Sequence, residues 1–419
     1  MPEPAIYTAS WLINPDSPPV AGGAVLVRDG KVAGAGTLTE LRRTHSVPVV
    51  EYPDCAIIPG FVNAHTHLEL THFPSWRLRT NIDYHPRHFT DWMIQLIKVA
   101  RGLKPDDYPQ SVHEGMRMCL ESGTTAIGEI LSNPGLTTIY KDSSLTGRLY
   151  FEVLGQGSTR FREKFDGALS AAVSGEAGSM TTGLSPHTPY TIGEEHLPCI
   201  SETAASHRLP LAIHISESEE ETEFLFDSSG PLATDFYPFV GWERYLTAPH
   251  RCSSTELLDR HGMLTPATLA VHCVHVTSAD ALILKERGVS IAICPRSNER
   301  LDVGLAPVPL FKKHGIPLAL GTDSLASNDS LSLWDEIRYA LDAFPADLTP
   351  AELFRMVTVG GASALGISGS CGSLEVGKRA DFQVVGNLGG GRVKLLESLV
   401  HGGIVQEVFA GGERFVGLT

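Results

Sequence analysis

The chain has 419 residues, of which 42% are hydrophobic and 19% are charged, and its formal net charge is −15 at pH 7. This composition is typical of a globular protein with a large core. No block rich in Lys and Arg is present, which argues against nucleic acid and anionic membrane surfaces as partners and favours a small molecule. Whether the chain forms a homo-oligomer stays open.

The amino-terminal sequence and the cysteines favour the cytoplasm. Residues 1–16 lack a basic stretch followed by an apolar run, so we expect no signal peptide. No apolar run approaches the ~18 residues that a membrane helix needs. The seven Cys residues form no CxxC pair and show no regular spacing, which indicates buried thiols in a reducing compartment.

The two ends of the chain are predicted to form short strands. Residues 1–58 contain the pair Asp29-Gly30 between two apolar runs, a strong hairpin signal. At the other end, RADFQVVG (379–386) and IVQEVFAGGERFVG (404–417) are also β-rich. We therefore expect residues 1–58 and 369–419 to pair into one small β-sandwich domain.

Residues 59–368 show a different pattern, in which apolar strand-like runs alternate with helix-like stretches such as 89–103, 278–288 and 332–344. Strands that alternate with helices indicate parallel βαβ units, and eight such runs predict a closed (β/α)8 TIM-like barrel. A doubly wound open sheet would be expected to carry a glycine-rich phosphate loop, and neither GxGxxG nor GxxxxGK[ST] occurs. The eight runs are 56–67, 124–130, 148–155, 181–187, 209–215, 268–276, 289–294 and 316–321.

Two connections in this region are long, 69–123 after the first run and 216–267 after the fifth. Long connections at the carboxyl face of a barrel often form lids or substrate walls.

Four side chains at strand ends predict a metal site. His65 and His67 are two residues apart on a strand and so point to the same face; His214 ends the fifth run and Asp323 follows the eighth. Three imidazoles and a carboxylate suit Zn or Fe(II) and leave a position for water. The alternatives are that the HxH pair arises by chance and that Asp323 caps a helix.

Further polar residues near these strand ends could transfer protons or bind substrate. Glu217 follows His214 by three residues, and His272 is expected to end the sixth strand. Both suit proton transfer to and from a water molecule. Glu217 could instead belong to the acidic face of a helix, and His275 competes with His272. His187, at the end of the fourth run, is favoured as a substrate contact.

Several motifs resemble those of the amidohydrolase superfamily, in the same order along the chain. They are IIPGFVNAHTHLE, HISE, AVHCVHV, CPRSN, LGTDS and GSLEVGKRADFQVV. The HxxE spacing of His214 and Glu217, and His187 where binuclear relatives carry a carbamylated Lys, resemble the mononuclear aminohydrolase branch. CPRSNERLDVGLAPV and GTDSLASNDSLSLWDE resemble aminodeoxyfutalosine deaminases and adenosylhomocysteine/methylthioadenosine deaminases.

The resemblance implies a hydrolase of carbon–nitrogen bonds in cyclic amidines that releases ammonia from an adenine-type nucleoside through a metal-activated water. It implies one divalent ion, zinc or Fe(II), held by the four residues named above. Glu217 would shuttle protons and contact substrate, His272 would orient the hydroxide, Asp323 would take the water's proton, and His187 would bind substrate. The alternatives are a guanine- or cytosine-type deaminase, a triazine-type chlorohydrolase, and a scaffold without catalysis.

The substrate itself stays open at this stage. The segment HLELTHF after the first run and the acidic stretch after His214 depart from the family pattern near the mouth of the barrel. Whether Glu69, Arg296 or Asn298 touches the substrate is not decided by the sequence.

Overall fold

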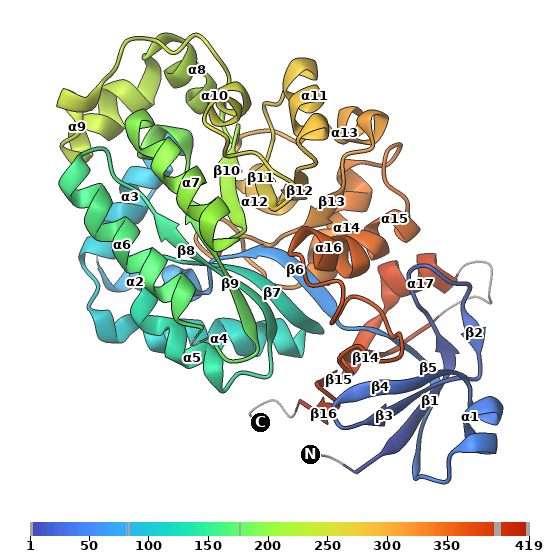
Figure 1. The fold of residues 1–419 in the computed structure, drawn as a ribbon. Coiled ribbons are helices and arrows are strands. Elements are labelled where there is room, and N and C mark those ends of the chain that lie inside the picture. Colours follow the sequence, from blue (N-terminus) through green and yellow to red (C-terminus); the bar gives the residue numbers. More distant parts are fainter. Residues whose placement is uncertain (1–2, 81, 83, 176, 389–394, 416–419) are drawn as a thin grey trace.

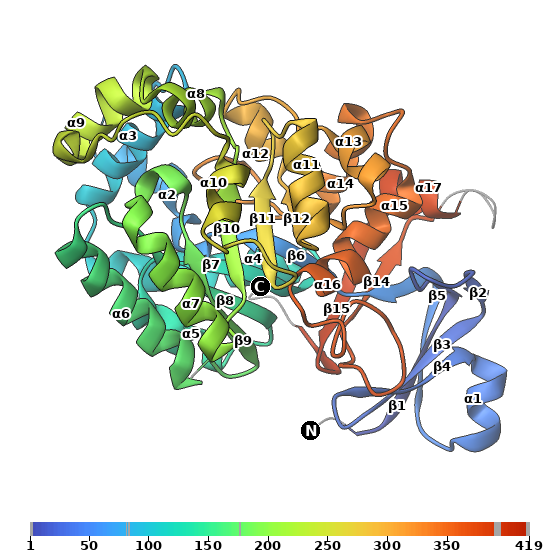
Figure 2. The same ribbon diagram turned by 45° about the horizontal axis from the view of Figure 1, so that its top comes forward.

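The computed structural model describes residues 3–415 except 81, 83, 176 and 389–394. Within these residues the strands form two sheets of eight strands each. One is a parallel barrel, and the other is a smaller sheet to which both ends of the chain contribute. Figures 1 and 2 show the blue and red ends of the sequence side by side in this smaller sheet. The predicted fold class is confirmed.

Each barrel strand pairs in parallel with its neighbour in the sequence. The ring closes between the first and last strands, where Thr66 bridges Asp323 and the Asp323 N–H donates to the His65 carbonyl at 3.1 Å. The closing seam therefore carries two of the predicted metal ligands. The strands are β6 (Phe61–Thr66), β7 (Thr124–Leu131), β8 (Thr146–Val153), β9 (Met180–Pro186), β10 (Leu211–Ile215), β11 (Thr268–His272), β12 (Ser290–Ile293) and β13 (Leu318–Leu320).

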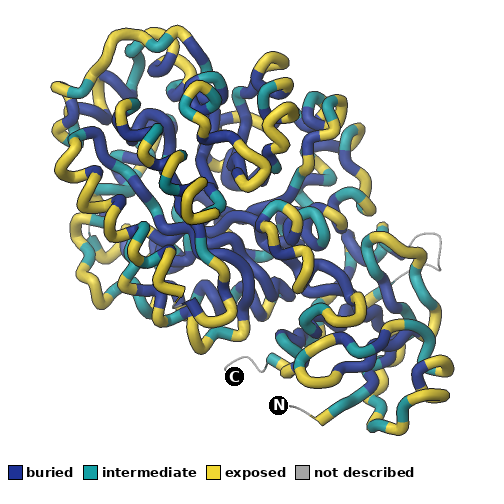
Figure 3. The backbone as a smooth tube through the Cα atoms, viewed as in Figure 1, coloured by how far each residue is buried: buried dark blue, intermediate teal, exposed yellow. Residues whose placement is uncertain are grey.

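The inside of the barrel is a packed core. Apolar side chains such as Val62, Ala126, Tyr150 and Val271 form one cluster, while outward residues of the same strands, such as Phe151, join the larger core under the helices. Figure 3 shows the strands buried and the exposed residues on the outer helices. Because side chains fill the lumen, chemistry is confined to the mouth formed by the loops at the carboxyl ends of the strands.

Helices cover the outside of the barrel, and several begin at side chains that satisfy the free N–H groups of the first turn. Ser253 and Thr277 form capping boxes with Glu256 and Asp280. The three predicted helices are confirmed, each two residues shorter than its predicted range. The barrel helices are α2 (Phe73–Arg79), α3 (Phe89–Arg101), α4 (Tyr108–Glu121), α5 (Thr137–Lys141), α6 (Ser158–Ser174), α7 (Leu197–His207), α8 (Glu219–Asp227), α9 (Tyr237–Val240), α10 (Ser254–Arg260), α11 (Ser278–Glu286), α12 (Pro295–Arg300), α13 (Val308–His314), α14 (Leu333–Ala343), α15 (Pro350–Arg355) and α16 (Gly361–Ala364).

The smaller sheet joins the two ends of the chain because β14 pairs antiparallel with β5. Asp29 and Gly30 have φ of 52° and 72°, as a two-residue hairpin requires, so the predicted hairpin is confirmed. Residues 416–417 of the predicted β-rich stretch lie outside the described residues, and the domain boundaries at 58 and 368 remain predictions. The elements are β1 (Ala5–Leu12), β2 (Val20–Ala21), β3 (Gly23–Arg28), β4 (Lys31–Thr37), α1 (Leu38–Thr44), β5 (Val49–Pro59), β14 (Phe382–Gly386), α17 (Leu395–Gly402), β15 (Ile404–Ala410) and β16 (Glu413–Arg414).

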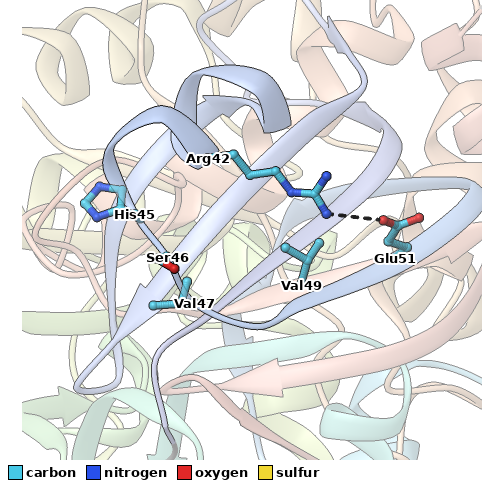
Figure 4. A pocket seen from close by; sticks show the side chains of 6 residues that line it. All are labelled: Arg42, His45, Ser46, Val47, Val49 and Glu51. Atoms are coloured by element: carbon cyan, nitrogen blue, oxygen red, sulfur yellow. Dashed lines mark ion pairs between the residues drawn. The ribbon is translucent and has the colours of Figure 1, made fainter.

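One hollow lies on the smaller sheet beside α1 (Figure 4). An ion pair of 3.8 Å crosses it between Arg42 and Glu51, whose side chains are 55% and 66% exposed. Exposed pairs contribute little to stability, and the lining includes no residue of the predicted site. It is lined by Arg42, His45, Ser46, Val47, Val49 and Glu51.

No helix within the described part of the chain is both long enough and apolar enough to cross a membrane.

Candidate active site

The three predicted histidine ligands meet at the mouth of the barrel. His67 Nε2 lies 3.2 Å from His65 Nε2 and 3.4 Å from His214 Nε2. The pairing of β6 with β7 shifts register between Asn63 and Thr66, and such an irregularity re-aims side chains next to active sites. As expected from their spacing, the rings of His65 and His67 reach the same side of the sheet.

Asp323 completes the cluster from the last strand. Its Oδ1 lies 3.7 Å from His65 Nε2 and 3.6 Å from His67 Nε2. Its Oδ2 accepts hydrogen bonds of 2.7 Å from the hydroxyls of Ser297 and Ser327. The backbone of Asp323 is left-handed, with φ of 59°, a conformation that costs energy in non-glycine residues and is found at functional sites.

The donors fit a divalent metal ion. Zinc–nitrogen bonds of about 2.0–2.1 Å place tetrahedral nitrogens about 3.3–3.4 Å apart, close to the separations between the histidine rings. The Nδ1 of His214 faces the His187 carbonyl at 2.8 Å, so a proton there leaves the Nε2 lone pair free to bind a metal. Burial lowers the pKa of His67 to about 3 and that of His214 well below its usual value, which keeps both imidazoles neutral, as ligands must be.

Two candidate proton-transfer groups face each other beside this cluster. Glu217 Oε1 lies 3.5 Å from His272 Nε2. Burial, together with the charges of Asp323 and Glu221, raises the pKa of Glu217 well above its usual value. Burial lowers the pKa of His272 to about 4. These shifts favour a protonated Glu217 and a neutral His272, both able to exchange a proton with a bound molecule.

Glu221 fixes the loop that carries Glu217. Its carboxylate accepts the backbone N–H groups of Ser216 and Glu217, each at 2.9 Å, and the hydroxyl of Ser254. Glu217 lies before α8 rather than on it, so the acidic face of that helix is formed by other glutamates.

His272 and His275 point in different directions. The sixth strand ends at His272, as expected, although the apolar run continues to residue 276: β11 stops where His272 and Cys273 adopt φ of 68° and 51°. The chain turns there, and His275 Nε2 faces the Val303 carbonyl at 2.8 Å. His272 instead faces the mouth, with Nδ1 2.9 Å from Asn298 Oδ1.

His187 borders the same space. It follows β9, and its ring centroid lies 5.1 Å from that of His214. Its Nδ1 is 3.0 Å from the Thr191 hydroxyl. Burial lowers its pKa, which favours a neutral imidazole.

The residues left open by the sequence take three different positions. Asn298 holds His272, and Arg296 turns away from the cluster to bind Asp329. Glu69 is buried and accepts the Ser132 N–H at 2.5 Å. Asn298, Ser297, Ser327 and Glu221 were missed as supporting residues because they contact the site from loops and helices whose course no sequence pattern fixes.

Known proteins resemble this chain along most of its length. Residues 56–414 match the model of the Amidohydrolase family. An aminodeoxyfutalosine deaminase of Deinococcus radiodurans is 31% identical over 358 residues, which cover 82% of this chain and 81% of that protein. A 5-methylthioadenosine/S-adenosylhomocysteine deaminase of Pelotomaculum thermopropionicum is 32% identical over 381 residues, 85% of this chain and 80% of that protein. The crystal structure of an adenosine deaminase from Xanthomonas campestris with bound zinc is 25% identical, with a TM-score of 0.80 over 98% of this chain and 92% of that one.

Proposed function

The chain belongs to the amidohydrolase family, and on this premise we propose that it is a metal-dependent deaminase that releases ammonia from the adenine ring of a nucleoside. The observation that carries the proposal is the buried pair of Glu217 and His272, 3.5 Å apart, beside the cluster of imidazoles and Asp323. The deaminase names of the relatives support the choice of an adenine nucleoside.

We infer that one zinc ion per chain is held by His65, His67, His214 and Asp323, and the zinc in the Xanthomonas structure supports this choice of metal. Fe(II) suits the same donors. When bound, such an ion acts as a Lewis acid and lowers the pKa of water in its coordination sphere to about 7. The free, irregularly spaced cysteines support the cytoplasm as the proposed compartment.

The chain's own residues then handle two protons. Asp323 takes one proton from the attacking water while His272, held by Asn298, orients it. The resulting hydroxide adds to the ring carbon that bears the amino group, and the protonated Glu217 gives its proton to the adjacent ring nitrogen. His187, which follows β9 at the same mouth, contacts the substrate.

Collapse of the adduct returns both carboxyl groups to their starting states. Glu217 recovers its proton from the added hydroxyl, which becomes a carbonyl, and Asp323 passes its proton to the amino group. The carbon–nitrogen bond breaks and ammonia leaves. The sum is water in, ammonia out, and a protonated ring nitrogen beside a carbonyl.

A substrate panel tests the proposal. The metal-loaded protein would be incubated with adenosine, methylthioadenosine, S-adenosylhomocysteine and aminodeoxyfutalosine, and separately with guanine, cytosine and a chlorinated triazine. We expect ammonia, with loss of adenine absorbance, from at least one member of the first group. Ammonia only from guanine or cytosine, or chloride from the triazine, would contradict the assignment.

A further inference from the structure

Glu152 points into the mouth of the barrel from β8. Two residues earlier, Tyr150 packs in the cluster that fills the lumen, whereas Leu149, Phe151 and Val153 belong to the outer core. Because side chains of a strand alternate between its faces, Glu152 lies on the same side as Tyr150. It is the last inward-facing residue of the strand and therefore stands at the mouth.

Its neighbours place Glu152 within the site. In the pairing of β8 with β9, Glu152 is opposite Ser185, and the N–H of His187 donates to the Val153 carbonyl at 3.0 Å. Burial is the main influence on the pKa of both His187 and Glu69, and the charge of Glu152 raises the pKa of each. Glu152 thus lies between the proposed substrate contact and the acidic residue after His67.

The carboxylate of Glu152 has no partner of its own. The residue is half-buried, and no hydrogen bond or ion pair joins it to any residue that the structure describes. A partly desolvated carboxylate accepts hydrogen bonds and cannot donate them when ionised, and leaving it unsatisfied is costly. Lys164, whose charge slightly lowers the pKa of nearby Glu69, is exposed on α6 and forms no ion pair with Glu152. A donor supplied by a ligand would complete this site.

The order of the strands indicates which part of a nucleoside reaches Glu152. The reacting edge of the base must lie against Glu217 and His272, which follow or end β10 and β11. In a closed ring of eight strands, β8 stands three strands from β11 and two from β10, across the mouth from His272. The sugar is attached to the adenine on the side away from the amino group, so it extends across the mouth towards β8.

We propose that Glu152 binds the hydroxyl groups of the substrate's sugar. This inference rests on the proposed function. Two vicinal hydroxyls offer two donors to the two carboxylate oxygens, and hydrogen bonds to a charged group are among the stronger ones.

The test compares Glu152→Ala and Glu152→Gln with a matched control, Glu163→Gln, whose glutamate is exposed on α6. In the wild type, we expect 2′,3′-dideoxyadenosine to have a kcat/KM on the order of 10- to 100-fold below that of adenosine. In Glu152→Ala the ratio of kcat/KM for adenosine to kcat/KM for dideoxyadenosine should fall to about one, through a higher KM for adenosine. The control should keep the wild-type ratio, and all variants should retain their metal content and thermal midpoint.

Glu152→Gln keeps an amide oxygen that accepts a hydrogen bond, so its ratio should lie between those of the wild type and Glu152→Ala. An unchanged dideoxyadenosine ratio in Glu152→Ala would overturn this inference alone. Release of no ammonia from any nucleoside by the metal-loaded wild type would overturn the proposed function, and this inference with it.

Discussion

At the scale of single residues, the proposed chemistry depends most on Glu217. Its side chain is buried at the mouth, and its pKa is raised by burial and by Asp323 and Glu221. A carboxyl group that is protonated near neutral pH can donate a proton to a ring nitrogen, which an ordinary surface glutamate cannot do efficiently.

We therefore expect Glu217→Gln to lower turnover by on the order of 10²- to 10⁴-fold, a typical general acid–base contribution. The metal content should not change, because the proposed ligands are other residues. The measurements are steady-state ammonia release and elemental analysis of the purified variant. Glu219→Gln, an exposed position in the first turn of α8, serves as the control; equal activity in the two variants would return Glu217 to a structural role.

The sequence identified the residues that converge because each stands at the end of an apolar strand. His65, His214 and Asp323 could be placed on one rim from that pattern alone. Their supporting contacts could not: the hydrogen bond from Ser327 to Asp323 depends on a loop, and the one between Asn298 and His272 depends on how α12 begins. The apolar sequence at the end of β11 does not distinguish the left-handed turn there from a continuing strand.

At the scale of secondary-structure elements, Glu129 joins three segments next to the first strand. It lies on β7 facing outward, and its carboxyl group accepts the Leu68 N–H at 2.9 Å, the Thr66 hydroxyl at 2.5 Å and the Tyr140 hydroxyl at 2.9 Å. Tyr140 belongs to α5, and Leu68 begins the turn after His67. Burial raises the pKa of Glu129 to about 8, so the folded protein holds its proton at neutral pH.

This shift makes stability depend on pH in a known direction. Between about 4.5 and about 8, the folded state keeps the Glu129 proton and the unfolded state loses it, so this group destabilises the fold as the pH rises through that window. Across that window, the free energy of unfolding of Glu129→Gln should fall by up to about 1.4 kcal/mol less per pH unit than that of the wild type. Urea unfolding of both proteins at pH 5, 6, 7 and 8 measures these free energies of unfolding. If the two proteins show the same dependence on pH, Glu129 is ionised in the folded state.

The two long connections, 69–123 and 216–267, could be predicted from the sequence, but the contacts that they make could not. The N–H of Thr90, at the start of α3, donates to Glu220 at 2.8 Å, and the Trp92 indole donates to the Ala326 carbonyl at 3.1 Å. These contacts bring α3 against α8 and against the loop after Asp323, as expected of a wall around the mouth. They join residues far apart in sequence, which local propensity does not encode.

At the scale of the whole molecule, the proposed ligands connect distant parts of the chain. They come from β6, β10 and the end of β13, and the barrel closes between the first and last of these strands through Asp323 and His65. A metal bound there would hold the seam of the barrel together. The smaller sheet makes a second connection between the ends of the chain through β5 and β14.

Removal of the metal should therefore weaken the whole fold as well as abolish turnover. An ion that binds only the folded state stabilises it by RT ln(1 + [L]/Kd), about 4 kcal/mol at a thousand-fold excess over Kd. We expect elemental analysis to give one divalent ion per chain, and dialysis against a chelator to lower the thermal midpoint by several degrees, with recovery on adding zinc. Asp323→Asn should show a much smaller shift on zinc addition, since a neutral amide is a weaker ligand than a carboxylate. A full thermal shift in that variant, or two tightly bound ions per active chain, would contradict a single site at the seam.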